Sequence, residues 1–148
     1  MIAVRPLAPS DETAWRALWH GYLQYYETEL PEEIYAESFA RLCDPDIPEY
    51  RGLVATAHGR QVGLTHFIFH RHGWKLENVV YLQDLYVAPD MRGTGTGRAL
   101  IEGVYAAADA AGCPEVYWLT QEFNTAGRRL YDRVGALTPF IKYRRDTS

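Results

Sequence analysis

The sequence of 148 residues has little cysteine, and its two thiols, Cys43 and Cys113, lie far apart in the chain. Because they do not form a CxxC pair, neither a metal site nor a disulfide framework is indicated. The sequence also lacks an apolar run of about 18 residues, and no basic stretch followed by an apolar one stands at its start. We therefore expect a cytoplasmic protein that is neither exported nor inserted in a membrane.

Positive charge is also in short supply. Lysine and arginine together number 15 against 19 aspartates and glutamates, which leaves a net charge of −4. A surface that binds nucleic acid needs a basic face to replace the counterions of the phosphates, so no nucleic-acid partner is expected. A cationic substrate fits this charge balance better.

Aromatic residues, in contrast, are abundant. They make up 14% of the chain, with 11 tyrosines and 4 tryptophans, and hydrophobic residues as a whole make up 47%. A chain of this length buries roughly 70% of its unfolded surface, which is enough for one self-sufficient core. Since no repeat, linker or low-complexity tract interrupts the sequence, we predict a single domain over residues 1–148.

The hydrophobic pattern predicts an α/β (α+β) fold. Strands are predicted at 2–5, 53–58, 62–70, 79–87, 115–119 and 140–144, and helices at 11–26, 31–43 and 124–134. A further helix is predicted after the glycine-rich segment, where Leu100, Val104, Ala108 and Ala111 keep helical spacing up to Gly112. The run 79–87 is nearly continuous in apolar and aromatic residues, which is typical of a central strand covered on both faces. Its polar pair, Gln83 and Asp84, therefore requires an explanation.

A glycine-rich segment, Arg92-Gly93-Thr94-Gly95-Thr96-Gly97-Arg98, joins the strand 79–87 to the next helix. Unpaired N–H groups at a helix start favour an anion, and glycines let the anion approach the backbone, so a diphosphate is the natural ligand. The spacing matches neither the ATP pattern GxxxxGK[ST] nor the dinucleotide pattern GxGxxG. The glycines can also serve only to make a tight turn.

Two motifs resemble those of the GCN5-related N-acetyltransferases. Leu85-Tyr86-Val87-Ala88-Pro89 followed by Arg92-Gly93-x-Gly95-x-Gly97 is similar to the coenzyme-binding motif, and Asn124-x-Ala126, Leu130-Tyr131 and Gly135 are similar to the second motif. The segments 81–87 and 116–124 resemble the branch of yeast histone and polyamine acetyltransferases and its bacterial relatives. The resemblance implies a mixed, mostly antiparallel sheet with splayed central strands, flanked by about four helices. It also implies acetyl-CoA as cosubstrate, without a metal, and a homodimer.

The resemblance carries the cofactor site over to this sequence residue by residue. The backbone of Leu85, Tyr86 and Val87 would face the pantetheine arm, and residues 93–98 would hold the pyrophosphate. The complete set of expected coenzyme contacts is Leu85, Tyr86, Val87, Arg92, Gly93, Thr94, Gly95, Thr96, Gly97, Arg98, Asn124 and Tyr131.

Acetyl transfer to an amine needs a neutral nitrogen, support for an oxyanion and a proton for the departing thiolate. Tyr131 stands at the position of the family's general acid, although its ring can also serve packing alone. A backbone N–H at Leu85 or Tyr86, freed by a strand bulge, would meet the oxyanion. Asp84 and Glu122 are the candidate bases, acting through water; Asp84 can instead be a buried acceptor of hydrogen bonds.

The acceptor is expected to be a primary amine on a small molecule, a polyamine, an amino acid or a lysine side chain. Aromatic faces and carboxylates suit an ammonium ion, so Tyr22, Tyr26, Glu29, Gln83 and Asp84 are the candidate substrate contacts. The two tyrosines share one face of the predicted helix with Trp15 and Trp19, and that face can instead be buried as plain core. The alternative function is a CoA-binding or sensing module without catalysis. The pair His70-x-His72 lacks a third ligand and is expected to lie in a solvated turn.

Overall fold

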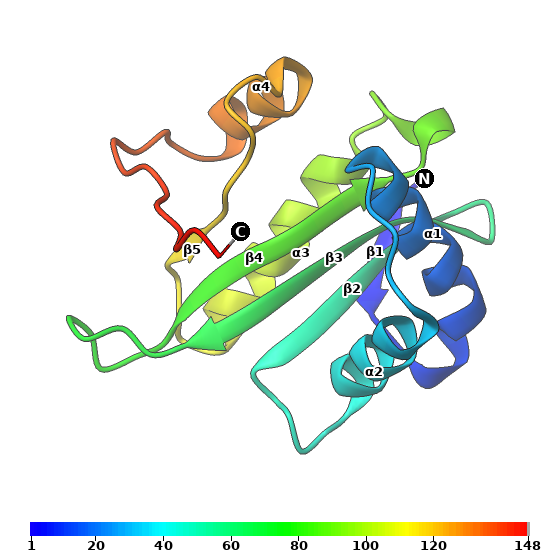
Figure 1. The fold of residues 1–148 in the computed structure, drawn as a ribbon, viewed down its shortest axis with the longest axis horizontal. Helices are drawn as coiled ribbons and strands as arrows, with labels where there is room; N and C mark the ends of the chain where they lie inside the picture. The colour runs from blue at the N-terminus through cyan, green and yellow to red at the C-terminus, as the bar shows by residue number, and fades with distance from the viewer. Residues whose placement is uncertain (148) are drawn as a thin grey trace.

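The computed structural model describes residues 1–147 and contains one five-stranded sheet in the order β1-β2-β3-β4-β5 (Figure 1). The strands are β1 (Ala3–Pro6), β2 (Tyr50–Ala57), β3 (Arg60–His70), β4 (Val79–Val87) and β5 (Val116–Tyr117). The helices are α1 (Glu12–Tyr25), α2 (Glu32–Cys43), α3 (Thr96–Ala110) and α4 (Thr125–Val134), with short 3-10 turns η1 (Pro9–Asp11) and η2 (Pro89–Met91). Strands β1 to β4 pair antiparallel and β5 joins β4 in parallel, so the predicted mixed, mostly antiparallel α/β fold is confirmed.

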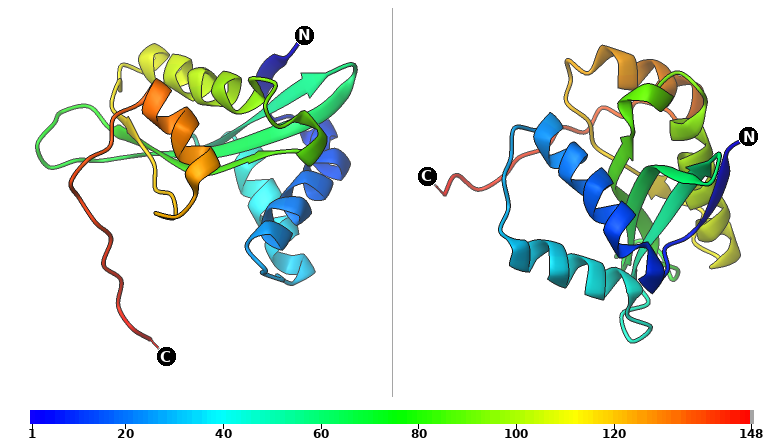
Figure 2. Two further views of the ribbon diagram at one scale, coloured as in Figure 1. Left: turned by 90° about the horizontal axis from the view of Figure 1, so that it is seen from above. Right: turned by 90° about the vertical axis from the view of Figure 1, so that its right-hand side faces the viewer.

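Helices cover both faces of the sheet (Figures 1 and 2). On one face, α1 and α2 form an aromatic core with the inner side of β3, centred on Trp15, Trp19 and Phe39. On the other face, α3 lies along the sheet and buries its apolar stripe of Leu100 and Val104 against β2, β3 and β4. Within residues 1–147, no helix is both long and apolar enough to cross a membrane.

Strands β4 and β5 touch over a very short length. Only Val80 and Tyr81 of β4 pair with Val116 and Tyr117, after which the chain of β5 turns away toward α4. Residues 82–87 of β4 therefore have a strand partner only on the β3 side, and their other edge is free of a ladder in the described chain. This is the splayed arrangement that the family resemblance implied.

A β-bulge interrupts β4 at its polar pair. His66 of β3 faces Asp84 and the next residue, Phe67, faces Leu82, so Gln83 is left without a partner. The extra residue changes the alternation of side chains. Leu82 and Leu85 therefore both pack in the core on the α3 side, whereas Asp84 points toward α1.

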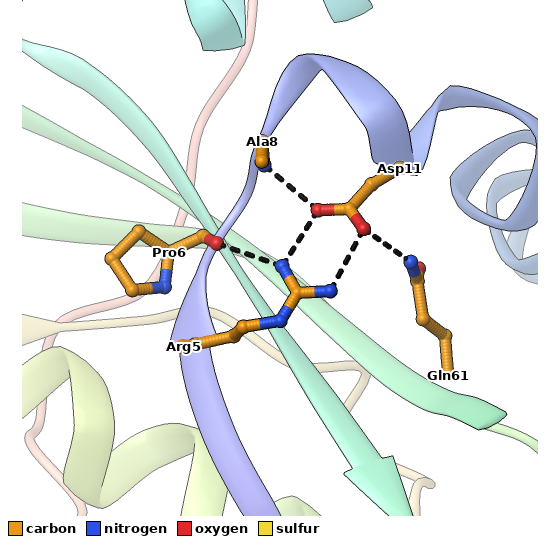
Figure 3. A network of polar contacts seen from close by, with 5 residues as sticks. All are labelled: Arg5, Pro6, Ala8, Asp11 and Gln61. Carbon is orange, nitrogen blue, oxygen red and sulfur yellow. Dashed lines mark hydrogen bonds and ion pairs between the residues drawn. The ribbon is translucent and has the colours of Figure 1, made fainter. Parts of the chain in front are cut away.

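The N-terminal strand is held to the first helix by a buried carboxylate (Figure 3). Asp11 is 5% exposed and accepts two hydrogen bonds of 2.8 Å from the guanidinium of Arg5. It also accepts one from the N–H of Ala8 at 2.8 Å and one from Gln61 at 2.7 Å. The Arg5 guanidinium holds the pKa of this carboxyl below its ordinary range. Asp11 therefore joins β1, η1 and β3 instead of capping α1 with its side chain.

The predicted strand at 140–144 is wrong. This segment has no ladder partner within the described residues, and its apolar side chains Phe140 and Ile141 are exposed. A strand needs a neighbouring edge, and β5, shorter than the predicted 115–119, offers only two residues. Figure 2 shows the segment extending away from the body of the protein. The other predicted strands and helices all form, with shifts of one to three residues at most ends.

Candidate active site

One large cleft lies where the C-terminal end of α1, the end of β4, the start of α3 and the exposed face of α4 meet. Its volume is about 740 Å³, which lies within the range of roughly 300–1,000 Å³ typical of ligand pockets. A narrow slot of about 40 Å³ adjoins it between β4 and residues 118–120. The cleft and the slot share four lining residues, namely Tyr22, Tyr26, Leu85 and Tyr131.

The glycine-rich turn (residues 92–98) forms one end of the cleft. Gly93 and Gly95 have φ angles of 77° and 88°, a left-handed conformation that favours glycine. Gly95 is the residue that precedes α3, so the unpaired N–H groups of the first helical turn begin directly behind it. Thr96 is buried, and its hydroxyl contacts that of Thr94 at 2.8 Å, which ties the turn to itself. The turn therefore has the form of an anion site.

Arginines surround this end of the cleft. Arg92 and Arg98 were predicted, and both line the cleft. Arg129 and Arg133 line it as well and were missed, although their spacing of four residues on a predicted helix was a signal that they share one face. Arg92 also lies over the ring of Tyr86, with its guanidinium carbon 5.7 Å from the ring centre.

Tyr131 lies at the junction of the cleft and the slot. Its ring packs edge-on against Trp118, with ring centres 5.6 Å apart. Burial raises the pKa of its phenol, and the nearby Tyr26 and Tyr25 raise it further, so the hydroxyl stays protonated at neutral pH. Tyr131 therefore faces the end of α1 across the cleft, carrying a proton that it can donate.

Asn124, the first residue of the second motif, begins α4. Its side-chain oxygen accepts a hydrogen bond of 3.1 Å from the N–H of Gly127, which is the usual task of a residue at this position. Its amide donates to the hydroxyl of Thr120 at 3.1 Å. Asn124 also lines the cleft, so one residue both starts the helix and borders the site.

Asp84 lies behind the cleft wall and has two side-chain partners. Its Oδ1 accepts a hydrogen bond of 2.7 Å from the hydroxyl of Tyr22, and its Oδ2 lies 3.0 Å from Nδ1 of His66. Asp84 is not among the residues that line the cleft or the slot, whereas Tyr22 lines both. His66 is 1% exposed and was missed, although a histidine inside an apolar strand was a signal, because a buried imidazole requires partners.

The remaining candidates divide into two groups. Gln83 lines the slot, and Leu85, Tyr86 and Val87 line the cleft. Glu29 and Glu122 are exposed and are not among the lining residues of either space.

Two further predicted features concern side chains at the surface. The hydroxyl of Thr94 donates to the carbonyl of Met91 and lies outside the lining. His70 contacts the hydroxyl of Tyr117 at 2.8 Å, and His72 accepts from the N–H of Trp74 at 3.1 Å. In the described part of the chain, no three histidine, cysteine, aspartate or glutamate side chains lie together as a metal site would require.

Comparison with known proteins identifies this architecture. A sequence profile described as the acetyltransferase (GNAT) family matches residues 15–136. The D-amino-acid N-acetyltransferase HPA3 of Saccharomyces cerevisiae is 39% identical over 146 residues, covering 98% of this chain and 91% of the yeast protein. The aminoglycoside N(6')-acetyltransferase type 1 of Stenotrophomonas maltophilia is 32% identical over 117 residues, covering 76% of this chain and 71% of that protein.

A solved structure shares the fold over the whole chain. The aminoglycoside acetyltransferase AAC(6')-Iy, in complex with the bisubstrate analog CoA-S-monomethyl-acetylneamine, superimposes with a TM-score of 0.85. The alignment covers 100% of this chain and 99% of that structure, at 19% sequence identity, so it bears on the fold alone. The family profile and the yeast relative show that the chain belongs to the acetyltransferase (GNAT) family and is an acetyl-CoA-dependent N-acetyltransferase, and the solved structure shows the shared fold.

Proposed function

We propose that the protein transfers an acetyl group from acetyl-CoA to a primary amine by direct attack in a ternary complex. One observation carries this proposal: the glycine-rich turn, Tyr131 and the tyrosines of α1 all line a single cleft. An extended acetyl donor and an amine bound in this cleft would therefore both lie near an anion-binding end, a group that donates a proton, and an aromatic wall.

The donor end of the cleft fits the charge and shape of coenzyme A. The left-handed Gly93 and Gly95 leave the backbone open to a diphosphate, and a Cβ atom at either position would meet nothing within 4 Å in the described chain. Arg92, Arg129 and Arg133 add positive charge for further phosphate oxygens. We propose that the free edge of β4 at Leu85 to Val87 pairs with the amide groups of the pantetheine arm, as an added strand would.

For the transfer step, coenzyme A supplies the acetyl thioester, and the protein has to manage the protons and the oxyanion. We propose that Tyr131 donates its proton to the departing thiolate, since burial keeps its phenol protonated. The N–H group of Leu85 or Tyr86, next to the bulge at Gln83, is our candidate for the oxyanion. Of the two carboxylates expected as base, Asp84 is favoured because Tyr22 connects it to the cleft, whereas Glu122 is exposed.

The acceptor end is built from phenol rings. Tyr22, Tyr25 and Tyr26 all line the cleft. The ring centre of Tyr26 lies 5.0 Å from that of Tyr22 and 5.0 Å from that of Tyr25. Ring faces attract a cation, and the carboxylate of Asp84 behind Tyr22 adds negative charge. We therefore propose a small-molecule amine that is charged in solution, such as an amino acid or a polyamine. Glu29 would contact only acceptors that extend beyond the cleft.

We propose a homodimer that uses the C-terminal segment, residues 136–147. Leu137, Phe140, Ile141 and Tyr143 are between 78% and 89% exposed, which is unfavourable for apolar side chains unless a second surface covers them. A second copy offers the matching partner, because an isologous contact can bury the same segment twice. A cytoplasmic location is proposed as well, since Cys43 and Cys113 are both free thiols.

The proposal is tested by measuring thiol release from acetyl-CoA with a panel of D- and L-amino acids, polyamines, aminoglycosides and lysine peptides, alongside calorimetric titration with CoA. We expect CoA binding and thiol release that depends on a small primary amine. CoA binding without thiol release for every amine would contradict catalysis and would support the alternative, a CoA-binding module.

A further inference from the structure

Four side chains form a continuous chain of hydrogen bonds from the core of the α1 face to the cleft. The indole Nε1 of Trp15 lies 3.0 Å from Nε2 of His66, and Nδ1 of His66 lies 3.0 Å from Oδ2 of Asp84. Oδ1 of Asp84 lies 2.7 Å from the hydroxyl of Tyr22. Trp15 is fully buried, and the side chains of His66 and Asp84 are 2% and 12% exposed.

The direction of each hydrogen bond follows from the chemistry of the groups. An indole N–H can only donate, so Nε2 of His66 accepts and carries no proton. The remaining nitrogen, Nδ1, then holds the proton of the neutral ring and donates it to Asp84. The Tyr22 hydroxyl donates to the other carboxylate oxygen. Both oxygens of Asp84 are therefore acceptors, and Trp15 sets the tautomer of His66.

The position of Asp84 determines how an amine in the cleft can reach it. Tyr22 lines the cleft and the slot, while Asp84 lines neither. The Tyr22 proton is directed at Asp84, so the phenol oxygen has its lone pairs available to accept from another donor. An ammonium group at the aromatic wall would thus meet the phenol of Tyr22, with the carboxylate on its far side.

We propose that Tyr22 and Asp84 form a proton relay that deprotonates the acceptor ammonium, with His66 and Trp15 as positioning residues. One N–H proton of the ammonium passes to the phenol oxygen of Tyr22, and the phenol proton passes to Oδ1 of Asp84. The ammonium becomes a neutral amine with a free lone pair, and the carboxylate becomes a carboxylic acid, which returns its proton to solvent by the same route after turnover. This relay rests on the function proposed above.

The surroundings of the relay favour a concerted transfer. Burial and the charge of Asp84 raise the pKa of Tyr22, so this phenol does not ionise on its own and has to receive one proton as it gives up another. The charge of Asp84 also reaches the phenols of Tyr26, Tyr50 and Tyr81, where it adds to the effect of burial in raising their pKa. Within residues 1–147, His66 is the only basic side chain that contacts Asp84, and it is neutral.

The decisive test compares two acceptors of the same shape, an alkylamine that is charged at pH 7 and its alkoxyamine analogue that is already neutral. For Tyr22→Phe, we expect kcat/KM for the alkylamine to fall about 100-fold, the usual contribution of a general base. The alkoxyamine needs no deprotonation, so its kcat/KM should change little, and so should the KM for acetyl-CoA. Raising the pH should recover the alkylamine rate, because solvent then supplies the neutral amine.

A matched control and a second variant complete this test. Tyr50→Phe removes a phenol hydroxyl beside the same cluster but outside the cleft lining and should leave both rates unchanged. In Asp84→Asn, the side-chain amide can still accept a hydrogen bond from Tyr22 but takes up no proton. This variant should therefore lose kcat/KM for the alkylamine, and not for the alkoxyamine, as Tyr22→Phe does. If Asp84→Asn does not fold, as judged by thermal unfolding, Tyr22→Phe alone decides.

Two results would overturn the relay in different ways. If wild type is active and Tyr22→Phe leaves the ratio of alkylamine to alkoxyamine rates unchanged, the relay is wrong while the proposed function stands. If wild type binds CoA but releases no thiol with either acceptor or with any amine of the panel, the proposed function fails and the relay fails with it.

Discussion

Replacing Gly95 by alanine tests how the glycine-rich turn binds anions. Gly95 has a φ angle of 88°, and the added Cβ atom would meet no atom of the described chain within 4 Å. The cost is therefore a backbone cost alone, about 1–2 kcal/mol for a left-handed L-residue. At about 2–4 °C per kcal/mol, the unfolding temperature should fall by about 2–8 °C.

The loss in coenzyme affinity comes from a different source. If the turn relaxes to a negative φ, at least one N–H group at the start of α3 turns away from the diphosphate. A hydrogen bond to a charged group contributes about 1.5–3 kcal/mol, so we expect the dissociation constant of CoA to rise about 10- to 100-fold. Thermal unfolding and calorimetric titration measure the two effects separately.

Gly59 provides the matched control. It lies in the turn between β2 and β3 with a φ of 75°, and it too has nothing within 4 Å of an added Cβ among the described atoms. Gly59→Ala should therefore destabilise the protein to the same degree while leaving CoA affinity unchanged. Equal CoA affinities for Gly95→Ala and Gly59→Ala would refute the assignment of the glycine-rich turn as the diphosphate site.

Three further predictions concern separate parts of the protein. Tyr131→Phe should lower kcat about 100-fold, as loss of a general acid does, with little change in CoA affinity; an unchanged rate of the chemical step in single-turnover kinetics would remove Tyr131 from the mechanism. Asp11→Asn should lower the free energy of unfolding at pH 7 by about 1–2 kcal/mol, toward the low end for charged hydrogen bonds because Arg5 is 45% exposed. The folded pKa of Asp11 lies below the unfolded value of about 3.9, so the stability difference between wild type and Asp11→Asn should be complete above about pH 5 and vanish as the pH falls through the folded pKa. Urea unfolding at several pH values measures this difference, and a difference that persists at pH 2 would argue against the ion pair as its source. Ile141→Glu should convert the proposed dimer to monomers in sedimentation velocity, and a monomeric wild type would contradict the dimer.

The sequence was sufficient for the features that depend on local pattern. The spacing of glycines predicted the turn before α3, and the near-continuous apolar run predicted the strand β4, although β5 pairs with it at Val80 and Tyr81 alone. The polar pair Gln83 and Asp84 stood out as an exception within that run. The structure explains the exception by the bulge at Gln83 and the hydrogen bonds of Asp84.

Features that depend on long-range contacts could not be predicted. The partners of Asp84 come from α1 and β3, at sequence separations of 62 and 18 residues, and no periodicity encodes such a meeting. The contacts of His66 with Trp15 and Asp84 could not be predicted for the same reason. The prediction of a strand at 140–144 was wrong for a related reason. The apolar residues of this segment suit a strand, but a strand forms only beside a free edge, and β5 is too short to provide one.

The central claim is that the acetyl group of acetyl-CoA is transferred to an amine bound in the same cleft. Incubating the protein with acetyl-CoA labelled in the acetyl carbons and an amine from the panel, followed by mass spectrometry and NMR of the products, follows that group directly. We predict labelled acetyl on the primary nitrogen of the amine, at a rate that depends on Tyr131. Label found only in free acetate, or only in intact acetyl-CoA, would contradict the account.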